Sequence, residues 1–350
     1  MEKLYFASDY QEGAHPEILR RLESSNLEHS PGYGADAWCA SAREKIRSAC
    51  KCPDAEIHFL VGGTQTNLVI IDALLRPYQG VIAADTGHIS SHEAGAIEAG
   101  GHKVLTLPNA NGKIFASQIR KLLDAYNGDA NRDHLVMPGM VYLSQPTEYG
   151  TLYSFAELTE ISDLCRENHL PLYIDGARLA YALACPENDV TLPDLAKLCD
   201  VFYIGGTKCG ALFGEAVVIP QPGLIPHLFT LIKQHGALLA KGRMLGIQFD
   251  ALFSDGLYEH IGISAIRSAD RIRSALASLG LPLCFSSPTN QIFCVLEDAL
   301  LARLQDSLEY SCWEKPDASH TIIRLATGWA TTVSDTEALL SLFSSLMQHK

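Results

Sequence analysis

The stretch that decides the fold consists of two apolar runs, Leu170-Pro-Leu-Tyr-Ile-Asp175-Gly-Ala-Arg178 and Asp200-Val-Phe-Tyr-Ile-Gly-Gly-Thr207-Lys208. Each run is short, contains β-branched and aromatic residues, and is followed by glycine, which is typical of a buried strand that ends in a turn. In a parallel α/β sheet, such strands bring their last residues to the carboxyl edge, where ligands bind. The two runs therefore predict that Asp175 and Lys208 lie at the same edge.

A carboxylate and an amine at this edge suit pyridoxal phosphate. Lys208 could join the cofactor's aldehyde as a Schiff base, and Asp175 could keep the pyridine nitrogen protonated so that the ring withdraws electrons. A surface lysine and a helix-capping aspartate would give the same pair, so these two residues alone leave both interpretations open.

Strand-like and helix-like stretches alternate from about residue 55 to 220. This alternation predicts an α/β fold with a largely parallel central sheet and helices on both faces. Strands are expected over 57–61, 81–84, 103–107, 140–144, 172–174, 201–204 and 216–219, and helices over 64–75, 117–126 and 155–168.

The pattern changes after Gly223 to a helix-rich stretch through about residue 279, followed by strands over 291–296 and 321–326 and a final helix. Capping boxes at Ser154-x-x-Glu157 and Ser334-x-x-Glu337 predict the starts of two helices. The change predicts a large domain over residues 1–250, N-terminal segment included, and a smaller α+β domain over residues 251–350.

The composition excludes several classes of protein. A net charge of -13 provides no basic surface for nucleic acid and disfavours anionic membranes. The N-terminus has no signal-peptide core and no stretch is apolar enough to span a membrane, so we expect a cytoplasmic location. The ten cysteines are scattered, and Cys50-Lys-Cys52 lacks the spacing of a zinc or redox motif, so no metal is expected.

Two further segments follow predicted strands. Gly62-Gly63-Thr64-Gln65 begins a helix, where free amides and the threonine hydroxyl could hold a phosphate. A tight turn that binds no ligand would have the same sequence pattern. It matches neither a Walker loop nor a dinucleotide fingerprint, which favours a single phosphate. Further on, His88 could lie flat on a planar cofactor ring, whereas His92 is expected to be structural.

These segments occur in the order and spacing of the threonine aldolase/β-eliminating lyase family, which the chain resembles from Ser8-Asp9 to Arg324-Leu-Ala-Thr327. The resemblance implies the aspartate aminotransferase-like fold of the type I pyridoxal phosphate enzymes. It also implies a lyase that cleaves the Cα–Cβ bond of a β-hydroxy-α-amino acid to glycine and an aldehyde.

The resemblance assigns cofactor roles to individual residues. Lys208 is similar to the lysine that carries the cofactor, Asp175 to the partner of the pyridine nitrogen, and Arg178 to the arginine beside the phenolic oxygen. His88 resembles the imidazole stacked on the ring. The residues expected on the phosphate are Gly63, Thr64 and Gln65.

Substrate and subunit roles follow in the same way. Ser8 and Arg324 resemble the pair that binds the substrate α-carboxylate, for which the planar fork of arginine is suited. Tyr33 is similar to a residue that reaches the site of a neighbouring subunit, which implies a homodimer or homotetramer.

Two departures from the family pattern leave the substrate open. Where the family carries a histidine near the substrate hydroxyl, this chain has Ser144-Gln-Pro-Thr147-Glu148, so the base would be His88, or Glu148 through a water. Lys241-Gly-Arg243 replaces a glycine-rich segment, and Arg243 or Lys241 could bind the phosphate instead. A β-eliminating lyase, an aminotransferase and a non-catalytic protein of the same fold remain alternatives.

Overall fold

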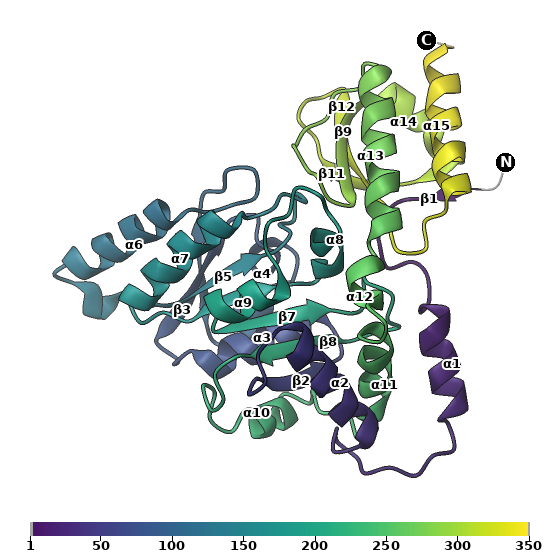
Figure 1. Ribbon diagram of the computed structural model, residues 1–350. Coiled ribbons are helices and arrows are strands. Elements are labelled where there is room, and N and C mark those ends of the chain that lie inside the picture. Colours follow the sequence, from purple (N-terminus) through teal and green to yellow (C-terminus); the bar gives the residue numbers. More distant parts are fainter. Residues whose placement is uncertain (1–2, 349–350) are drawn as a thin grey trace.

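The computed structural model describes residues 3–348 as a three-layered α/β unit that carries a smaller α+β unit beside it (Figure 1). The central sheet has seven strands. In spatial order they are β2 (Glu56–Leu60), β8 (Glu215–Ile219), β7 (Val201–Gly205), β6 (Leu172–Asp175), β5 (Met137–Ser144), β3 (Gln79–Ala84) and β4 (Lys103–Leu107).

Strand directions agree with the expectation of a largely parallel sheet. β8 is antiparallel to both β2 and β7, and the other neighbours pair in parallel. All seven strands expected between residues 55 and 220 are present, with ends displaced by a few residues. Because β5, β6 and β7 are neighbours that run in the same direction, their carboxyl ends meet at one edge of the sheet.

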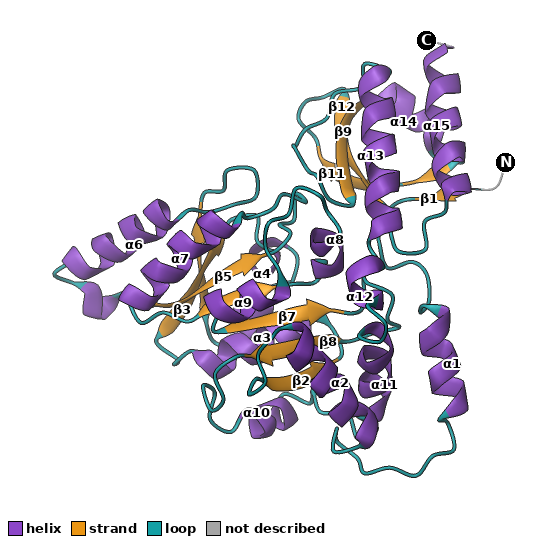
Figure 2. Cartoon of the chain, in the orientation of Figure 1, coloured by secondary structure: helices purple, strands orange, loops and turns teal. Residues whose placement is uncertain are grey.

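Helices cover both faces of this sheet (Figure 2). One buried apolar cluster joins one face to α3 (Gly63–Leu74) and α10 (Leu228–Gln234). The other face packs against α2 (Ala37–Ala49), α7 (Phe155–Glu167) and α9 (Leu192–Leu198). The remaining helices of this unit are α1 (Pro16–Ser24), α4 (His88–Ser91), α5 (Ala96–Ala99), α6 (Ala116–Gly128), α8 (Leu179–Leu183), α11 (Arg243–Leu252), α12 (Leu257–His260) and a 3₁₀ turn (Arg132–His134).

The smaller unit contains an antiparallel sheet in the order β11 (Ser311–Glu314), β12 (His320–Ala326), β9 (Gln291–Glu297). Its helices are α13 (Ile263–Ser278), α14 (Asp298–Leu304) and α15 (Val333–Gln348). The N-terminal strand β1 (Leu4–Tyr5) pairs in parallel with β10 (Leu308–Glu309), and Phe6 is buried in the core of this unit. Within α13, Ile266 belongs to the core of the larger unit and Ala269 to that of the smaller one, so this helix joins them. The boundary at residue 250 stays a prediction.

One of the two expected capping boxes is confirmed. Ser154 and Glu157 bond reciprocally at the start of α7. The box expected at Ser334 is wrong, because Thr332 and Asp335 cap α15 two residues earlier. No helix within residues 3–348 has the length and apolar character needed to cross a membrane.

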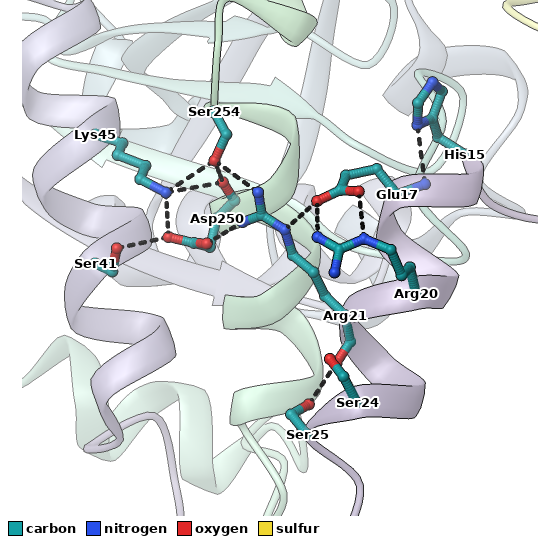
Figure 3. A network of polar contacts seen from close by, with 10 residues as sticks. All are labelled: His15, Glu17, Arg20, Arg21, Ser24, Ser25, Ser41, Lys45, Asp250 and Ser254. Carbon is teal, nitrogen blue, oxygen red and sulfur yellow. Dashed lines mark hydrogen bonds and ion pairs between the residues drawn. The ribbon is translucent and has the colours of Figure 1, made fainter.

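A polar network fixes α1 against α2 and α11 (Figure 3). The carboxylate of Asp250, which is buried on α11, pairs with Arg21 of α1 and with Lys45 of α2, whose Nζ lies 2.6 Å from Oδ1. Ser41 Oγ donates to the same oxygen at 2.6 Å, so a buried charge is balanced from two helices.

We expect Asp250→Ala to lower the free energy of unfolding by about 3 kcal/mol, because it removes the buried carboxylate that Lys45 and Arg21 share, and only Arg21 keeps a second carboxylate, that of Glu17. Denaturant titration measures the change. Arg20→Ala is the control, because Arg20 pairs with Glu17 at the surface and its loss should cost far less than that of Asp250. Equal losses in the two variants would contradict a special role for the buried carboxylate.

Candidate active site

A cavity of about 370 Å³ opens at the carboxyl edge of β5, β6 and β7. Its position follows from the sheet, because β6 ends at Asp175 and Lys208 follows β7 by three residues. The structure brings most of the predicted residues together here: the lining includes Gly63, Thr64, His88, Glu148, Asp175, Arg178 and Lys208.

Asp175 is buried beneath this cavity and accepts several hydrogen bonds. The hydroxyls of Tyr142 and Tyr203 donate to its two oxygens, and Asn67 Nδ2 donates to Oδ2 at 3.0 Å. Burial alone would raise the pKa of Asp175, but the positive charge of His88 and these hydrogen bonds outweigh it and hold the pKa below its usual value. Asp175 is therefore a buried, ionised carboxylate.

His88 is oriented by a second carboxylate. Its Nδ1 lies 2.6 Å from Oε1 of Glu93, which also accepts from Asn67 Nδ2 at 2.7 Å. Asn67 thus connects Glu93 with Asp175, and Tyr173 in turn donates to Asn67 Oδ1. The imidazole is held in one orientation at the wall of the cavity.

The amine of Lys208 lines the cavity among charged groups. Burial and the positive charge of Arg178 lower its pKa below that of a free lysine, although Asp9, Asp175 and Glu215 oppose the shift. A lysine with a lowered pKa is unprotonated more often, and an unprotonated amine attacks a carbonyl carbon.

Glu215 also lines the cavity, at the start of β8. It accepts hydrogen bonds from the amide of Gly206 and the hydroxyl of Thr207, and burial raises its pKa to about 8. The hydrogen bond from Thr207 and the positive charge of Lys208 oppose this rise in pKa.

Arg178 forms a two-bond ion pair with Asp9. Its Nε lies 2.6 Å from Oδ2, and a second nitrogen lies 3.0 Å from Oδ1. Burial opposes ionisation of Asp9, but Arg178 lowers its pKa to about 2. Asn290 of the smaller unit donates to the same carboxylate at 2.8 Å, so this pair lies where the two units meet.

The start of α3 forms the phosphate-type loop that the sequence predicted. Gly62 precedes the helix and no side chain caps it, so its first amides are free for a ligand. A Cβ on Gly63 would lie 3.1 Å from the hydroxyl of Tyr203, a close contact that would push against the donor to Asp175. Gln65 turns away and accepts from the amide of Val61, so its side chain is engaged in the helix start.

A second cavity of about 260 Å³ adjoins the first and shares His88, Glu148 and Lys208 with it. Its outer wall comes from the smaller unit and includes Gln291, Trp313 and Arg324. Among residues 3–348, Nε of Arg324 and Nε2 of Gln291 are buried donors without a hydrogen-bond partner. Burial lowers the pKa of Arg324 to about 10, so it stays cationic at neutral pH.

Glu148 lies between the two cavities. Its Oε1 accepts from the amide of His88 at 2.9 Å and from Ser144 Oγ at 2.6 Å. Burial raises its pKa, and the negative charge of Asp175 acts in the same direction.

Two predicted residues, Arg243 and Tyr33, line neither cavity. Arg243 donates to the backbone carbonyls of Ser25, Asn26 and Glu28, so a single chain offers no support for its expected phosphate contact. Tyr33 is exposed, with Lys233 over its ring at 4.7 Å.

Ser8, which is half-buried, lies close to Arg324 in the structure. It follows Ala7, whose carbonyl accepts from Arg324 at 3.0 Å.

Sequence reasoning missed several residues of this site. Tyr142, Tyr173 and Tyr203 carry hydroxyl groups inside buried strands that are mostly apolar, and that combination is a usable signal because a buried hydroxyl needs a hydrogen-bond partner. Glu215 gave a similar signal as a carboxylate within an apolar strand. His92 was expected to be structural, but it lines both cavities.

The donor set fits pyridoxal phosphate. Lys208 could carry the aldehyde carbon, Asp175 could hold a protonated pyridine nitrogen, and the uncapped start of α3 could receive the phosphate. The charges match as well, because an ionised buried carboxylate and an amine of lowered pKa line one cavity.

Fold and site together define an enzyme of the type I pyridoxal phosphate class. The fold is similar to that of an aspartate aminotransferase from Thermus thermophilus, with a TM-score of 0.71 at 14% identity over 98% of this chain and 91% of the other. Residues 6–299 match the β-eliminating lyase family, and the chain belongs to that family.

Individual relatives are more similar still. A structure of threonine aldolase from Leishmania major has a TM-score of 0.95 and 42% identity, covering 98% of this chain and 99% of the other. A low specificity L-threonine aldolase from Pseudomonas sp. (strain NCIMB 10558) is 32% identical over 308 residues, which is 86% of each chain. The family resemblance read from the sequence is confirmed.

We expect Lys208→Ala to abolish the visible absorbance of covalently held cofactor and its fixation by borohydride, because no other amine lines the cavity in the described part of the chain. Absorbance spectra and mass spectrometry after reduction measure both. Lys197→Ala, at an exposed position on α9, is the matched control and should retain both signals. Fixation at another lysine in the Lys208 variant would overturn the assignment.

Proposed function

We propose that this protein is a pyridoxal phosphate-dependent aldehyde-lyase that cleaves a β-hydroxy-α-amino acid of the threonine or allo-threonine type to glycine and an aldehyde. The observation that carries the proposal is the junction of two cavities, one with the cofactor donors and one with unpaired donors on Arg324 and Gln291. The names of the relatives from Leishmania and Pseudomonas support the same reaction.

When bound, the cofactor supplies an electron sink for the bond that breaks at Cα. Asp175 would hold the proton on the pyridine nitrogen, and its low pKa supports that role. His88 would lie against the ring, with Glu93 fixing its orientation. Arg178, locked by Asp9, would stay beside the cofactor's phenolic oxygen.

The substrate carboxylate would bind Arg324, with Ser8 nearby. Its Nε is a buried donor without a partner among the described residues, and such a donor is costly to leave unsatisfied. The guanidinium also lies over Trp313, with Cζ 5.4 Å from the ring centroid, which limits its rotation. A carboxylate fixed there would orient Cα so that the Cα–Cβ bond, and not another bond to Cα, stands perpendicular to the plane of the cofactor ring.

Assembly and location complete the proposal. We infer a homodimer or homotetramer in which Tyr33 reaches the site of a neighbouring subunit. The exposed ring of Tyr33 supports this, because a large aromatic side chain at the surface is typical of an interface. We also propose a cytoplasmic location.

Product analysis tests the proposed reaction. The purified protein is incubated with threonine, allo-threonine, phenylserine and serine, and glycine, aldehyde, ammonia and keto acid are measured together. Equal amounts of glycine and aldehyde are expected. Ammonia with a keto acid would indicate β-elimination instead. If all four products were absent, the result would contradict catalysis.

Asp175→Asn should lower kcat by at least about 100-fold, or about 2.7 kcal/mol in barrier, because a neutral amide stabilises a pyridinium far less than a carboxylate does. Steady-state kinetics with threonine measure it, and the cofactor content should be retained. Asp163→Asn, at an exposed position on α7, is the control. A variant within about tenfold of the wild type would mean that Asp175 is not the ring partner.

Arg324→Lys should lower kcat/KM by one to two orders of magnitude for every amino-acid substrate, while the cofactor absorbance stays unchanged. An ammonium cannot reproduce the two parallel bonds of a guanidinium, and charge-assisted bonds contribute roughly 1.5–3 kcal/mol each. Kinetics with threonine and phenylserine measure the loss. A loss confined to one substrate would show that Arg324 reads the side chain and not the carboxylate.

A further inference from the structure

His92 lies where the two cavities meet, one residue after α4. Its ring is stacked between those of His88 and Trp313, with centroid distances of 5.8 Å and 5.4 Å and interplanar angles of 20° and 21°. One neighbour belongs to the cofactor side and the other to the smaller unit. The imidazole is therefore positioned between the proposed cofactor and the substrate side of the site.

The nitrogens of His92 differ in their partners. Nδ1 lies 2.6 Å from Ser91 Oγ, whereas Nε2 has no hydrogen bond to any residue in the range 3–348. His88, by comparison, has its Nδ1 held by Glu93. Both hydrogen bonds to Glu148 fall on Oε1 and fix that carboxyl in the wall. His92 thus offers an unengaged nitrogen beside the cavity.

The surroundings of His92 favour its neutral form. The side chain is partly exposed, and the part that is buried lowers its pKa; the positive charges of His88, Arg324, Arg178 and Lys208 lower the pKa further. Glu148 faces the same cavity, and burial raises the pKa of its carboxyl. A neutral imidazole can accept a proton at neutral pH.

We propose that His92 is the general base that takes the proton from the β-hydroxyl of the substrate. This inference rests on the proposed function, since only cleavage of a β-hydroxy amino acid needs such a base. A substrate that binds Arg324 and reacts at the cofactor beside Lys208 would lie in the cavity that these two residues and His92 line. His92 would thereby fill the place of the histidine that the segment after β5 lacks.

The proton and electron balance is complete. The hydroxyl O–H bond breaks and its proton passes to Nε2 of His92. The electron pair left on oxygen forms the C=O bond of the aldehyde, and the Cα–Cβ pair stays with the glycine fragment. Cα then gains one proton and His92 returns one, so the amino acid gives glycine and aldehyde without net proton change.

The test separates the hydroxyl step from the rest of the chemistry. In His92→Asn, kcat for threonine cleavage should fall by at least about 100-fold, the usual range for loss of a general base. NMR can also measure the rate at which the Cα proton of glycine exchanges for deuterium. This rate should stay within about threefold of wild type, because glycine has no hydroxyl group that must lose a proton. Cleavage within threefold of wild type, or equal losses in both reactions, would overturn the proposal.

Two further variants sharpen the comparison. His169→Asn makes the same substitution at an exposed turn before β6, at the opposite edge of the sheet from Asp175, and should leave both reactions unchanged. Glu148→Gln tests the rival base. Suppose that Glu148→Gln lost threonine cleavage but kept the exchange reaction, while His92→Asn kept both reactions. Glu148 would then be the base, and the proposal would fail.

A chemical readout does not depend on turnover. Diethyl pyrocarbonate modifies neutral imidazoles, and peptide mass spectrometry can follow its reaction at His92 across a pH series. The apparent pKa of His92 should lie below about 6.5, the value of a free histidine. A value above that would overturn the proposal. Absence of glycine and aldehyde from the wild type would instead contradict the proposed function itself, so the two failures are distinguishable.

Discussion

The buried carboxylate of Asp175 is the constraint on which the rest of the site depends. An ionised group at this depth is costly unless donors surround it. Tyr142, Tyr203 and Asn67 supply those donors, and the tyrosines can do so because they lie on the strands to either side of β6. The central strands therefore stabilise a negative charge that the proposed cofactor chemistry would use.

The site is divided between the two units of the fold. The larger unit supplies the amine of Lys208 and the carboxylates, whereas the sheet of the smaller one supplies Arg324 and Trp313. Asp9 joins the two, because it bonds Arg178 on one side and Asn290 on the other. Since β1 lies with the smaller unit, the N-terminal segment fixes both halves relative to one another.

Periodicity predicted the central sheet well, because buried parallel strands read as short apolar runs separated by amphipathic helices. It missed the pairing of β1 with β10, a contact between residues about three hundred positions apart that no local pattern encodes. The start of α15 was misplaced for a related reason. Thr332 and Ser334 both have a carboxylate three residues on, and only the path of the chain decided which pair caps the helix.

The sequence by itself determined that an amine and a carboxylate lie together, and the family resemblance indicated the cofactor that they would hold. Strand ends carrying Asp175 and Lys208 have to meet at one edge of a parallel sheet, so an amine and a carboxylate there follow from strand order alone. Only the tertiary structure decided the direction and surroundings of side chains. It turned Gln65 and Arg243 toward backbone groups, and it brought His92 against Trp313 from a distant strand. Side-chain direction and long-range contacts depend on packing across the whole chain, which no short segment encodes.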